Sequence, residues 1–330
     1  MSIKWYDIRE YRNRWKTFNI IISARGVGKT YSALLHLLEE SAKGHEILYL
    51  RNTDVQIQSC ATDFGNPFKA INRKEGRAIF IKRAKECGYI YEDLGEDNQF
   101  IGYAAALSTF ENLRGVNLEA VTDIVFDEFI ENRNLKFDQF RSFLSMYETI
   151  NRNREIEGQE PLRVFMLSNA QKLYSPILAG FGLIPVVEEM LRNGQRNYST
   201  KDIWISLPES EVSEAKKDTA LYRAAAGTEY FSEAIENKFA NDSFDAIRKQ
   251  KIVEYNPYCA IDDIYIYKHK STGDFYATSV PAQNVQHYSS RVNALLLFRS
   301  VYPSLALAYA GGSLSFSDFT TKARLLDLIG

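Results

Sequence analysis

The chain has 330 residues, of which 45% are apolar and 25% charged, and its formal net charge is −2 at pH 7. This length suits two domains, and the near-neutral charge excludes a protein that is basic over its whole surface, so any DNA contact must come from a local cluster or from several subunits together. No apolar run is long enough to cross a bilayer, the N-terminus is not a signal peptide, and three widely spaced cysteines favour a reducing cytosol over a disulfide framework or a zinc site.

The N-terminal segment, residues 1–17, carries Trp5, Tyr6, Tyr11 and Trp15 among charged side chains. This pattern predicts a short helix that packs beside the first strand. One of these aromatic residues could stack on a nucleotide base, but packing against the core is the commoner role for such residues.

The first strand leads into a turn that is typical of phosphate-binding loops. Phe18–Ile22 is apolar, the turn at 23–30 reads Ser-Ala-Arg-Gly-Val-Gly-Lys-Thr, and helical periodicity follows over Tyr31–Ala42. Glycines let such a loop bring backbone N–H groups to phosphate oxygens, while its lysine reaches the β- and γ-phosphates and its threonine holds Mg²⁺. The residues expected to contact ATP are Ala24, Arg25, Gly26, Val27, Gly28, Lys29, Thr30 and Tyr31.

One position departs from the usual G-x-x-x-x-G-K-[ST] pattern, because Ser23 stands where the first glycine belongs. Serine is small and fits there with modest backbone strain, so the match is weakened rather than lost. A chance Gly-Lys-Thr at an ordinary turn is the alternative. The assignment therefore depends on a second half of the site.

The segments that follow predict a second buried strand over Glu46–Leu50, which ends at Arg51, and then a polar, irregular stretch over 52–76. Three short runs then predict antiparallel strands that decorate the fold, at 78–82, 89–91 and 100–103.

The missing half of the site is an apolar strand that ends in two acids, Ile124–Glu128. At the carboxyl end of a parallel strand, Asp127 can hold Mg²⁺ together with Thr30. Glu128 can polarise a water for attack on the γ-phosphate. Such a strand end is common by chance, but together with the upstream loop it indicates nucleotide hydrolysis.

Three polar residues near these strands are further candidates. The strand Arg163–Leu167 leads to Asn169, which can sense the γ-phosphate or simply form a turn. In P-loop ATPases whose catalytic Glu follows the metal-binding Asp, this extra strand lies between the two motif strands. Arg114 and Arg152 are candidates for a guanidinium that a neighbouring subunit supplies to the transition state, although most surface arginines are solvated.

Five short motifs in this order make the chain resemble the genome-packaging ATPases of small phi-29-like tailed bacteriophages, a terminase-like class of P-loop proteins. The motifs are Ser23–Thr30, Ile124–Ile130, Arg152–Glu155, Leu167–Ala170 and Gly227–Tyr230. The resemblance spans essentially the whole chain, and it is strong up to the last motif and weak beyond it.

The resemblance implies a ring, a homopentamer in that family, that uses ATP and Mg²⁺ to drive double-stranded DNA into an empty procapsid. The motor would act in the host cytoplasm, transiently at the portal vertex, with no membrane involved. The portal (connector) and a structural packaging RNA are further partners that it implies.

The resemblance also assigns roles to single residues. Arg152 matches the arginine finger that acts on the neighbouring subunit, and Arg114 matches a basic residue that is a second contact of this kind or structural. The loop after the acids would face the central channel, where Arg133 and Lys136 could touch DNA phosphates. A solvated surface loop is the alternative for these two residues.

For the fold, we expect an α/β protein with a P-loop parallel-sheet ATPase domain of the RecA- or terminase-like (ASCE) type over 1–207, which includes a lid segment from residue 171. A linker helix over 208–227 would join it to a smaller α+β domain over 228–330, which the resemblance describes as a vestigial, RNase H-like nuclease. Asp262, Asp263 and Asp274 are the only plausible remnants of the nuclease acids there. Two of them are neighbours on an expected strand and face opposite sides, so nuclease activity is not expected.

Two other classes of function remain open. A small-molecule P-loop kinase or a nucleotide-gated switch would hydrolyse little ATP without its acceptor and would not respond to DNA. A capsid-vertex adaptor that binds nucleotide structurally would bind ATP without turnover.

Overall fold

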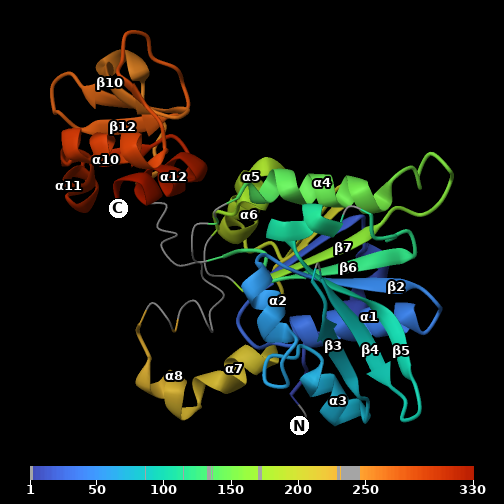
Figure 1. Cartoon of the computed structure of the whole chain (residues 1–330). Coiled ribbons are helices and arrows are strands. Elements are labelled where there is room, and N and C mark those ends of the chain that lie inside the picture. The colour runs from blue at the N-terminus through green and yellow to red at the C-terminus, as the bar shows by residue number, and fades with distance from the viewer. Residues whose placement is uncertain are drawn as a thin grey trace. The chain divides into compact units, whose positions relative to one another are not determined.

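The computed structural model describes residues 3–85, 87–113, 115–131, 135, 137–169, 173–228, 231 and 246–330. The chain divides into two units, one of Met1–Phe181 with Val186–Ala240 and one of Gly182–Pro185 with Asn241–Gly330. Figure 1 follows the chain from blue at the N-terminus to red at the C-terminus. The domain boundaries at 207 and 227 stay predictions, and the end of the Gly227–Tyr230 motif lies outside the described residues.

The larger unit is built on a mixed β-sheet whose central strands run parallel. Its described strands are β1 Phe18–Ser23, β2 Glu46–Arg51, β3 Ile79–Arg83, β4 Gly88–Asp93, β5 Asn98–Ala106, β6 Val121–Asp127, β7 Arg163–Asn169, β8 Asn197–Ser199 and β9 Ile203–Ser206. Their order in the sheet is β3-β4-β5-β2-β6-β7-β1-β9-β8, with parallel pairs from β5 to β9 and antiparallel pairs at both edges. The position of β7 between β1 and β6 confirms the predicted arrangement of the motif strands, and the parallel-sheet domain is confirmed with it.

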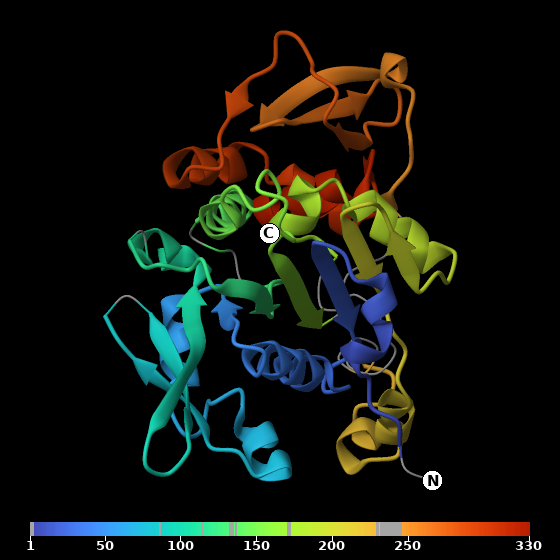
Figure 2. The same ribbon diagram turned by 90° about the vertical axis from the view of Figure 1, so that its right-hand side faces the viewer.

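Helices cover both faces of this sheet. Those before residue 228 are η1 Ile8–Arg14, α1 Lys29–Ser41, α2 Asp54–Cys60, α3 Lys69–Glu75, η2 Leu107–Leu113, α4 Gln139–Asn151, α5 Pro176–Gly180, α6 Ile184–Arg192, α7 Glu211–Lys217 and α8 Ala220–Ala224. Val125 of β6 packs in the core cluster of α1, whereas the next residue, Phe126, stacks on Phe143 of α4 with ring centroids 6.3 Å apart. Because successive strand residues point to opposite faces, α1 and α4 lie on opposite sides of the sheet (Figures 1 and 2).

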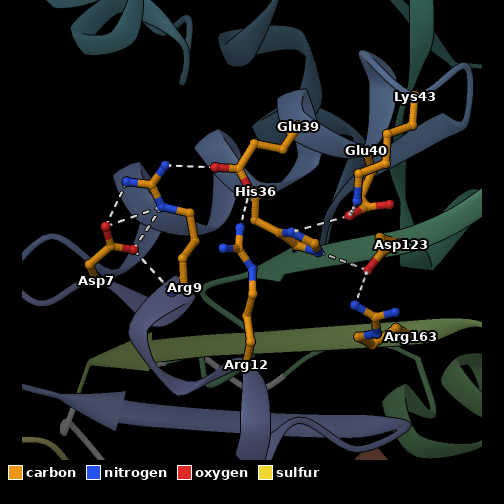
Figure 3. Close-up of polar contacts among 9 residues, drawn as sticks. All are labelled: Asp7, Arg9, Arg12, His36, Glu39, Glu40, Lys43, Asp123 and Arg163. Atoms are coloured by element: carbon orange, nitrogen blue, oxygen red, sulfur yellow. Dashed lines mark hydrogen bonds and ion pairs between the residues drawn. The ribbon is translucent and has the colours of Figure 1, made fainter.

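Buried polar contacts fix α1 against the strand that ends in the two acids (Figure 3). His36 Nε2 of α1 lies 2.9 Å from Asp123 Oδ1 of β6, and both side chains are 1% exposed. Arg163 Nη1 of β7 lies 3.5 Å from the same carboxylate oxygen. Burial alone would raise the pKa of Asp123, but His36 and Arg163 outweigh it, so the pKa is lowered and the carboxylate stays charged. The helix that starts at Lys29 is thereby held to β6.

Three segments of the larger unit differ from the sequence expectations. The stretch 52–76 is not irregular but contains α2 and α3, and these helices are too short to show a clear helical period. Part of the expected lid segment is a sheet strand, because β9 pairs in parallel with β1. The single linker helix expected near 210–226 is two helices, α7 and α8.

The smaller unit has a five-stranded sheet among its described residues, in the order β13-β10-β11-β12-β14. Its elements are η4 Ile252–Glu254, β10 Tyr255–Ile261, β11 Ile264–His269, β12 Phe275–Thr278, β13 His287–Tyr288, α10 Val292–Val301, α11 Ser304–Ala310, β14 Leu314–Phe316 and α12 Phe319–Ile329. β11 and β12 pair antiparallel as a hairpin about residues 271–274, and the smaller α+β architecture is confirmed. In the described chain no single helix meets the length and apolarity of a membrane span, whereas α10 and α11, bent by 68°, meet them only as a pair.

The acids of the smaller unit are arranged differently from the prediction. Asp262 and Asp263 are not strand neighbours but form the turn between β10 and β11, where Asp262 has a φ of 49°. Asp263 Oδ2 accepts from Arg324 Nη1 at 2.8 Å, whereas Asp274 Oδ2 accepts from Thr272 Oγ1 at 2.8 Å. Each carboxylate therefore has its own local partner. The RNase H-like origin of this unit stays a prediction.

Candidate active site

The turn between β1 and α1 holds its glycines in left-handed conformations. φ is 68° at Gly26 and 112° at Gly28, a region that residues with a Cβ rarely adopt. A Cβ on Gly28 would also lie 3.0 Å from the carbonyl oxygen of Tyr6, since the N-terminal segment packs directly on the loop. Ser23 is not among the residues with positive φ. The conformation at this position therefore does not require the glycine of the usual pattern.

The ammonium group of Lys29 lies at the base of this loop and is 6% exposed. Its Nζ donates to Ser23 Oγ and to the Ala24 carbonyl oxygen, both at 2.9 Å, and to Asn169 Oδ1 at 3.2 Å. Ser23 thus serves as a hydrogen-bond acceptor for the lysine. Burial lowers the pKa of Lys29 to about 7. A bound anion would favour the charged form of this amine.

The metal-binding candidates Thr30 and Asp127 are in direct contact. Thr30 Oγ1 donates to Asp127 Oδ1 at 3.0 Å, and Tyr49 OH donates to Asp127 Oδ2 at 3.0 Å. Burial raises the pKa of Asp127, against the opposing effect of Arg51, whose Nη1 lies 3.3 Å from Oδ2. A hydroxyl and a carboxylate are hard oxygen donors of the kind that Mg²⁺ prefers. The residues at this position therefore fit a magnesium ion.

Glu128 follows the end of β6 and has a φ of 52°, an uncommon conformation for a residue with a side chain. Its side chain is 46% exposed, and its carboxylate forms an ion pair with Arg51 Nη2. Arg51 ends β2, which pairs in parallel with β6, so one guanidinium contacts both acids. Arg51 thus occupies the carboxylate of the predicted base, Glu128.

One cavity of about 330 Å³ joins these groups at the edge of the sheet where the parallel strands end. The predicted residues that line it are Arg25, Gly26, Val27, Gly28, Lys29, Thr30, Tyr31, Asp127, Glu128 and Asn169. Ala24 lies behind the loop, where its carbonyl oxygen accepts from Lys29. The geometry therefore brings together both halves of the predicted site and the candidate sensor.

The remaining predicted residues do not line this cavity in the described structure. Arg152 follows α4 and has a φ of 47°. Its side chain is 55% exposed, and its Nη1 lies 3.8 Å from Glu119 Oε2. Arg114, Arg133 and Lys136 lie outside the described residues.

Sequence reasoning missed two residues that contact the site, and it favoured packing in the core for a third. Arg51 was seen only as the end of a strand, and the pairing of β2 with β6 that gives it a role is not visible in the sequence. Lys216 of α7 donates from Nζ to the Arg25 carbonyl oxygen at 2.5 Å. Trp5 lines the cavity and is 54% exposed, so it is not packed in the core as expected.

The chain is similar in sequence and in fold to several known proteins. The DNA packaging protein of Bacillus phage B103 is 29% identical over 241 residues, which cover 71% of this chain and 68% of that protein. The N-terminal domain of the DNA packaging ATPase from bacteriophage phi29 matches with a TM-score of 0.51 and 25% identity over 62% of this chain and 97% of that one. A chain of the bacteriophage Phi-29 viral genome packaging motor assembly shares the fold over 98% of both chains, with a TM-score of 0.65 and 18% identity. The profile of the podovirus DNA encapsidation protein (Gp16) family matches residues 2–259, and this chain therefore belongs to that family.

Proposed function

We propose that this protein is the ATPase of a packaging motor that drives double-stranded viral DNA into an empty procapsid. The observation that carries the proposal is the single cavity that holds Lys29, the Thr30–Asp127 pair and Glu128. The names of its relatives, a DNA packaging protein and a DNA packaging ATPase, support a motor over a metabolic enzyme.

Each residue of the cavity has a task in ATP hydrolysis. Lys29 moves its charge from the carbonyl oxygen of Ala24 to the β- and γ-phosphates, where the anionic partner keeps it protonated. Thr30 and Asp127 would hold Mg²⁺, which neutralises phosphate charge when bound. Glu128 accepts a proton from the attacking water as the oxygen–phosphorus bond forms and the bond to the ADP oxygen breaks. This step needs the Glu128 carboxylate free of Arg51.

The second part of the proposal is that ATP is hydrolysed between neighbouring subunits of a ring. The resemblance to the phi-29-like packaging ATPases implies that this ring is a pentamer. Arg152 is exposed and does not line the cavity of its own chain, which suits a guanidinium that reaches the phosphates of a neighbour. Arg114 would be a second contact across the same interface or a structural residue.

The partners of the motor follow from the family. Arg133 and Lys136 would contact the DNA backbone, which positions DNA without reading its sequence. The smaller unit would dock on the portal or on a structural RNA, and the motor would act in the host cytoplasm at the portal vertex. The separate local partners of Asp263 and Asp274 support the expectation that this unit does not cleave DNA, because two-metal cleavage needs converging carboxylates.

Family membership favours the motor over a small-molecule kinase, a nucleotide-gated switch or a capsid-vertex adaptor. A motor should hydrolyse ATP faster when double-stranded DNA and portal-bearing empty capsids are added to the purified protein. A rate that ignores both additions would favour the kinase or the switch, and tight ATP binding without turnover would favour the adaptor.

Mixing two inactive variants tests the sharing of the site. Glu128→Gln and Arg152→Ala should each abolish ATPase activity, whereas Arg141→Ala, at another exposed arginine of α4, should not. In a ring mixed at equal amounts, about a quarter of the interfaces combine an intact Glu128 with an intact Arg152 from the neighbour. Partial recovery is therefore expected. A mixture as inactive as the single variants would refute catalysis across the interface.

A further inference from the structure

Aromatic side chains form the outer wall of the cavity that contains the phosphate-binding loop. Trp5 and Tyr31 line it together with Lys29 and the two acids. The other two tryptophans are placed differently, since Trp204 is fully buried and Trp15 packs edge-on against Phe165 with ring centroids 4.9 Å apart. Trp5 is the tryptophan that faces the site, with 54% of its surface exposed.

Backbone contacts hold Trp5 in this position. The N–H of Tyr6 donates to the carbonyl oxygen of Val27 at 3.1 Å, and the N–H of Ile8 donates to Ser32 Oγ at 3.2 Å. The Trp5 side chain lies against the loop, because its Cβ and Cε3 are 3.6 Å from the point where a Cβ of Gly28 would stand. Both of its neighbours in the chain are thus tied to other parts of the molecule, Lys4 through the 3.0 Å bond of its N–H to Glu211 Oε2.

The ammonium group of Lys74 lies over both aromatic rings. Lys74 Nζ is 4.7 Å from the ring centroid of Tyr31 and 5.7 Å from that of Trp5. Tyr31 OH donates to Glu75 Oε1 at 2.9 Å, so α3 orients the second ring. An aromatic ring offers a stacking face, and an ammonium group donates hydrogen bonds to ring nitrogens or carbonyl oxygens. This combination suits a nucleobase.

We propose that Trp5, Tyr31 and Lys74 form the subsite for the base of the bound nucleotide, with the base stacked on Trp5. The assignment rests on the proposed function, in which the triphosphate of ATP binds to the loop. The base is the aromatic part of ATP, so it is the part that can stack on these rings. Stacking tolerates any base but is stronger for the larger ring system of a purine. The subsite therefore predicts a preference for purine over pyrimidine triphosphates.

The rival role for Trp5 is structural, since its packing on Gly28 could simply shape the loop. The two roles differ in what they do to a ligand without a base. If Trp5 forms a base subsite, its substitution weakens the binding of ATP but not the binding of inorganic tripolyphosphate. If Trp5 shapes the loop, its substitution weakens the binding of both ligands.

The experiment measures the dissociation constants of MgATP and of magnesium tripolyphosphate by titration calorimetry on the full chain. Trp5→Ala should weaken the binding of ATP about tenfold, which is within the usual effect of removing one stacked aromatic residue. The binding of tripolyphosphate should stay unchanged. Trp5→Phe should lose less ATP affinity than Trp5→Ala. Phe64→Ala is the matched control, because Phe64 is 92% exposed, also has a lysine over its ring and does not line the cavity.

The outcomes separate this subsite from the site as a whole. Equal loss of both ligands in Trp5→Ala, or no loss of either, would overturn the base subsite and leave the proposed ATPase intact. Undiminished binding of both ligands by Lys29→Ala would instead overturn the phosphate site on which the proposed function depends.

Discussion

Replacing the buried lysine of the phosphate-binding loop should stabilise the protein in the absence of nucleotide. Lys29 is 6% exposed, and burial brings its pKa from 10.5 to about 7. At 1.36 kcal/mol per pH unit, and with the folded-state amine half deprotonated, this difference corresponds to about 4 kcal/mol against folding at pH 7. Lys29→Met removes that cost but leaves Ser23 Oγ and the Ala24 carbonyl oxygen without their donor, which costs ~1–3 kcal/mol. We therefore expect a net gain of ~2 kcal/mol in the free energy of unfolding.

The gain in unfolding free energy of the Lys29→Met variant should shrink as the pH rises. The direction of this change follows from the number of protons bound by the folded and the unfolded chain. Between about pH 7 and 10.5 the unfolded chain keeps the Lys29 proton that the folded chain has released. The stability of the unaltered protein therefore rises with pH over this window, whereas the methionine variant lacks the effect. The difference in unfolding free energy between the Lys29→Met variant and the unaltered protein should fall by about 3 kcal/mol from pH 7 to pH 9.5.

Urea unfolding of both proteins across this pH range, with and without MgATP, measures the effect. Lys201→Met, at an exposed lysine, is the control and should show no such pH dependence. Saturating MgATP should stabilise the unaltered chain by ~2–3 kcal/mol and the Lys29→Met variant by nothing. A variant that is less stable than the unaltered protein at pH 7, with a difference that does not change with pH, would refute the reasoning.

Three further substitutions test the acids and their partners. Glu128→Gln should retain MgATP binding while turnover falls ~10²- to 10⁴-fold, as phosphate release measures; unchanged turnover would exclude Glu128 as the base. Thr30→Val removes the hydroxyl that lies 3.0 Å from Asp127 Oδ1, so ATP affinity should lose its dependence on Mg²⁺, and an unaltered dependence in calorimetry would contradict this. Arg51→Ala leaves the buried Asp127 without its cation and should cost ~3 kcal/mol of unfolding free energy in urea; a loss below ~1 kcal/mol would mean that solvent screens the pair.

The sequence predicted those parts of the site that local patterns specify. The strand before Ser23, the helix from Lys29 and the acids that end β6 each follow from a few consecutive residues, and parallel strands place such ends at one edge of a sheet. Thr30 and Asp127 were predicted to hold one metal ion on this basis, and the structure places Thr30 Oγ1 3.0 Å from Asp127 Oδ1. The departure at Ser23 also has an explanation that the sequence did not offer, because its hydroxyl binds Lys29.

What the sequence did not predict depends on pairing between distant segments. β9 has only four residues, and its burial, with Trp204 fully covered, comes from pairing with β1 far upstream. A short apolar run in a segment rich in glycine and proline resembles a lid until its partner strand is known. The Asp262–Asp263 pair was likewise placed on a strand because Ala260–Lys268 was interpreted as one continuous strand, whereas a two-residue turn there lets β10 and β11 pair antiparallel.

The end of β2 also connects the catalytic acid to the segment that follows it. Arg51 binds the Glu128 carboxylate, and the next residue, Asn52, donates from Nδ2 to the Glu128 carbonyl oxygen at 2.9 Å and to Glu131 Oε1 at 3.1 Å. Gln56 of α2 donates to the same Glu131 oxygen at 2.7 Å. Because Glu131 is the last described residue before the loop predicted to contact DNA, these contacts join that loop and Glu128 to one strand end. If that loop contacts DNA and Glu128 is the base, as proposed, a displacement of Glu131 that moves Asn52 is expected to disturb the ion pair of Arg51 with Glu128.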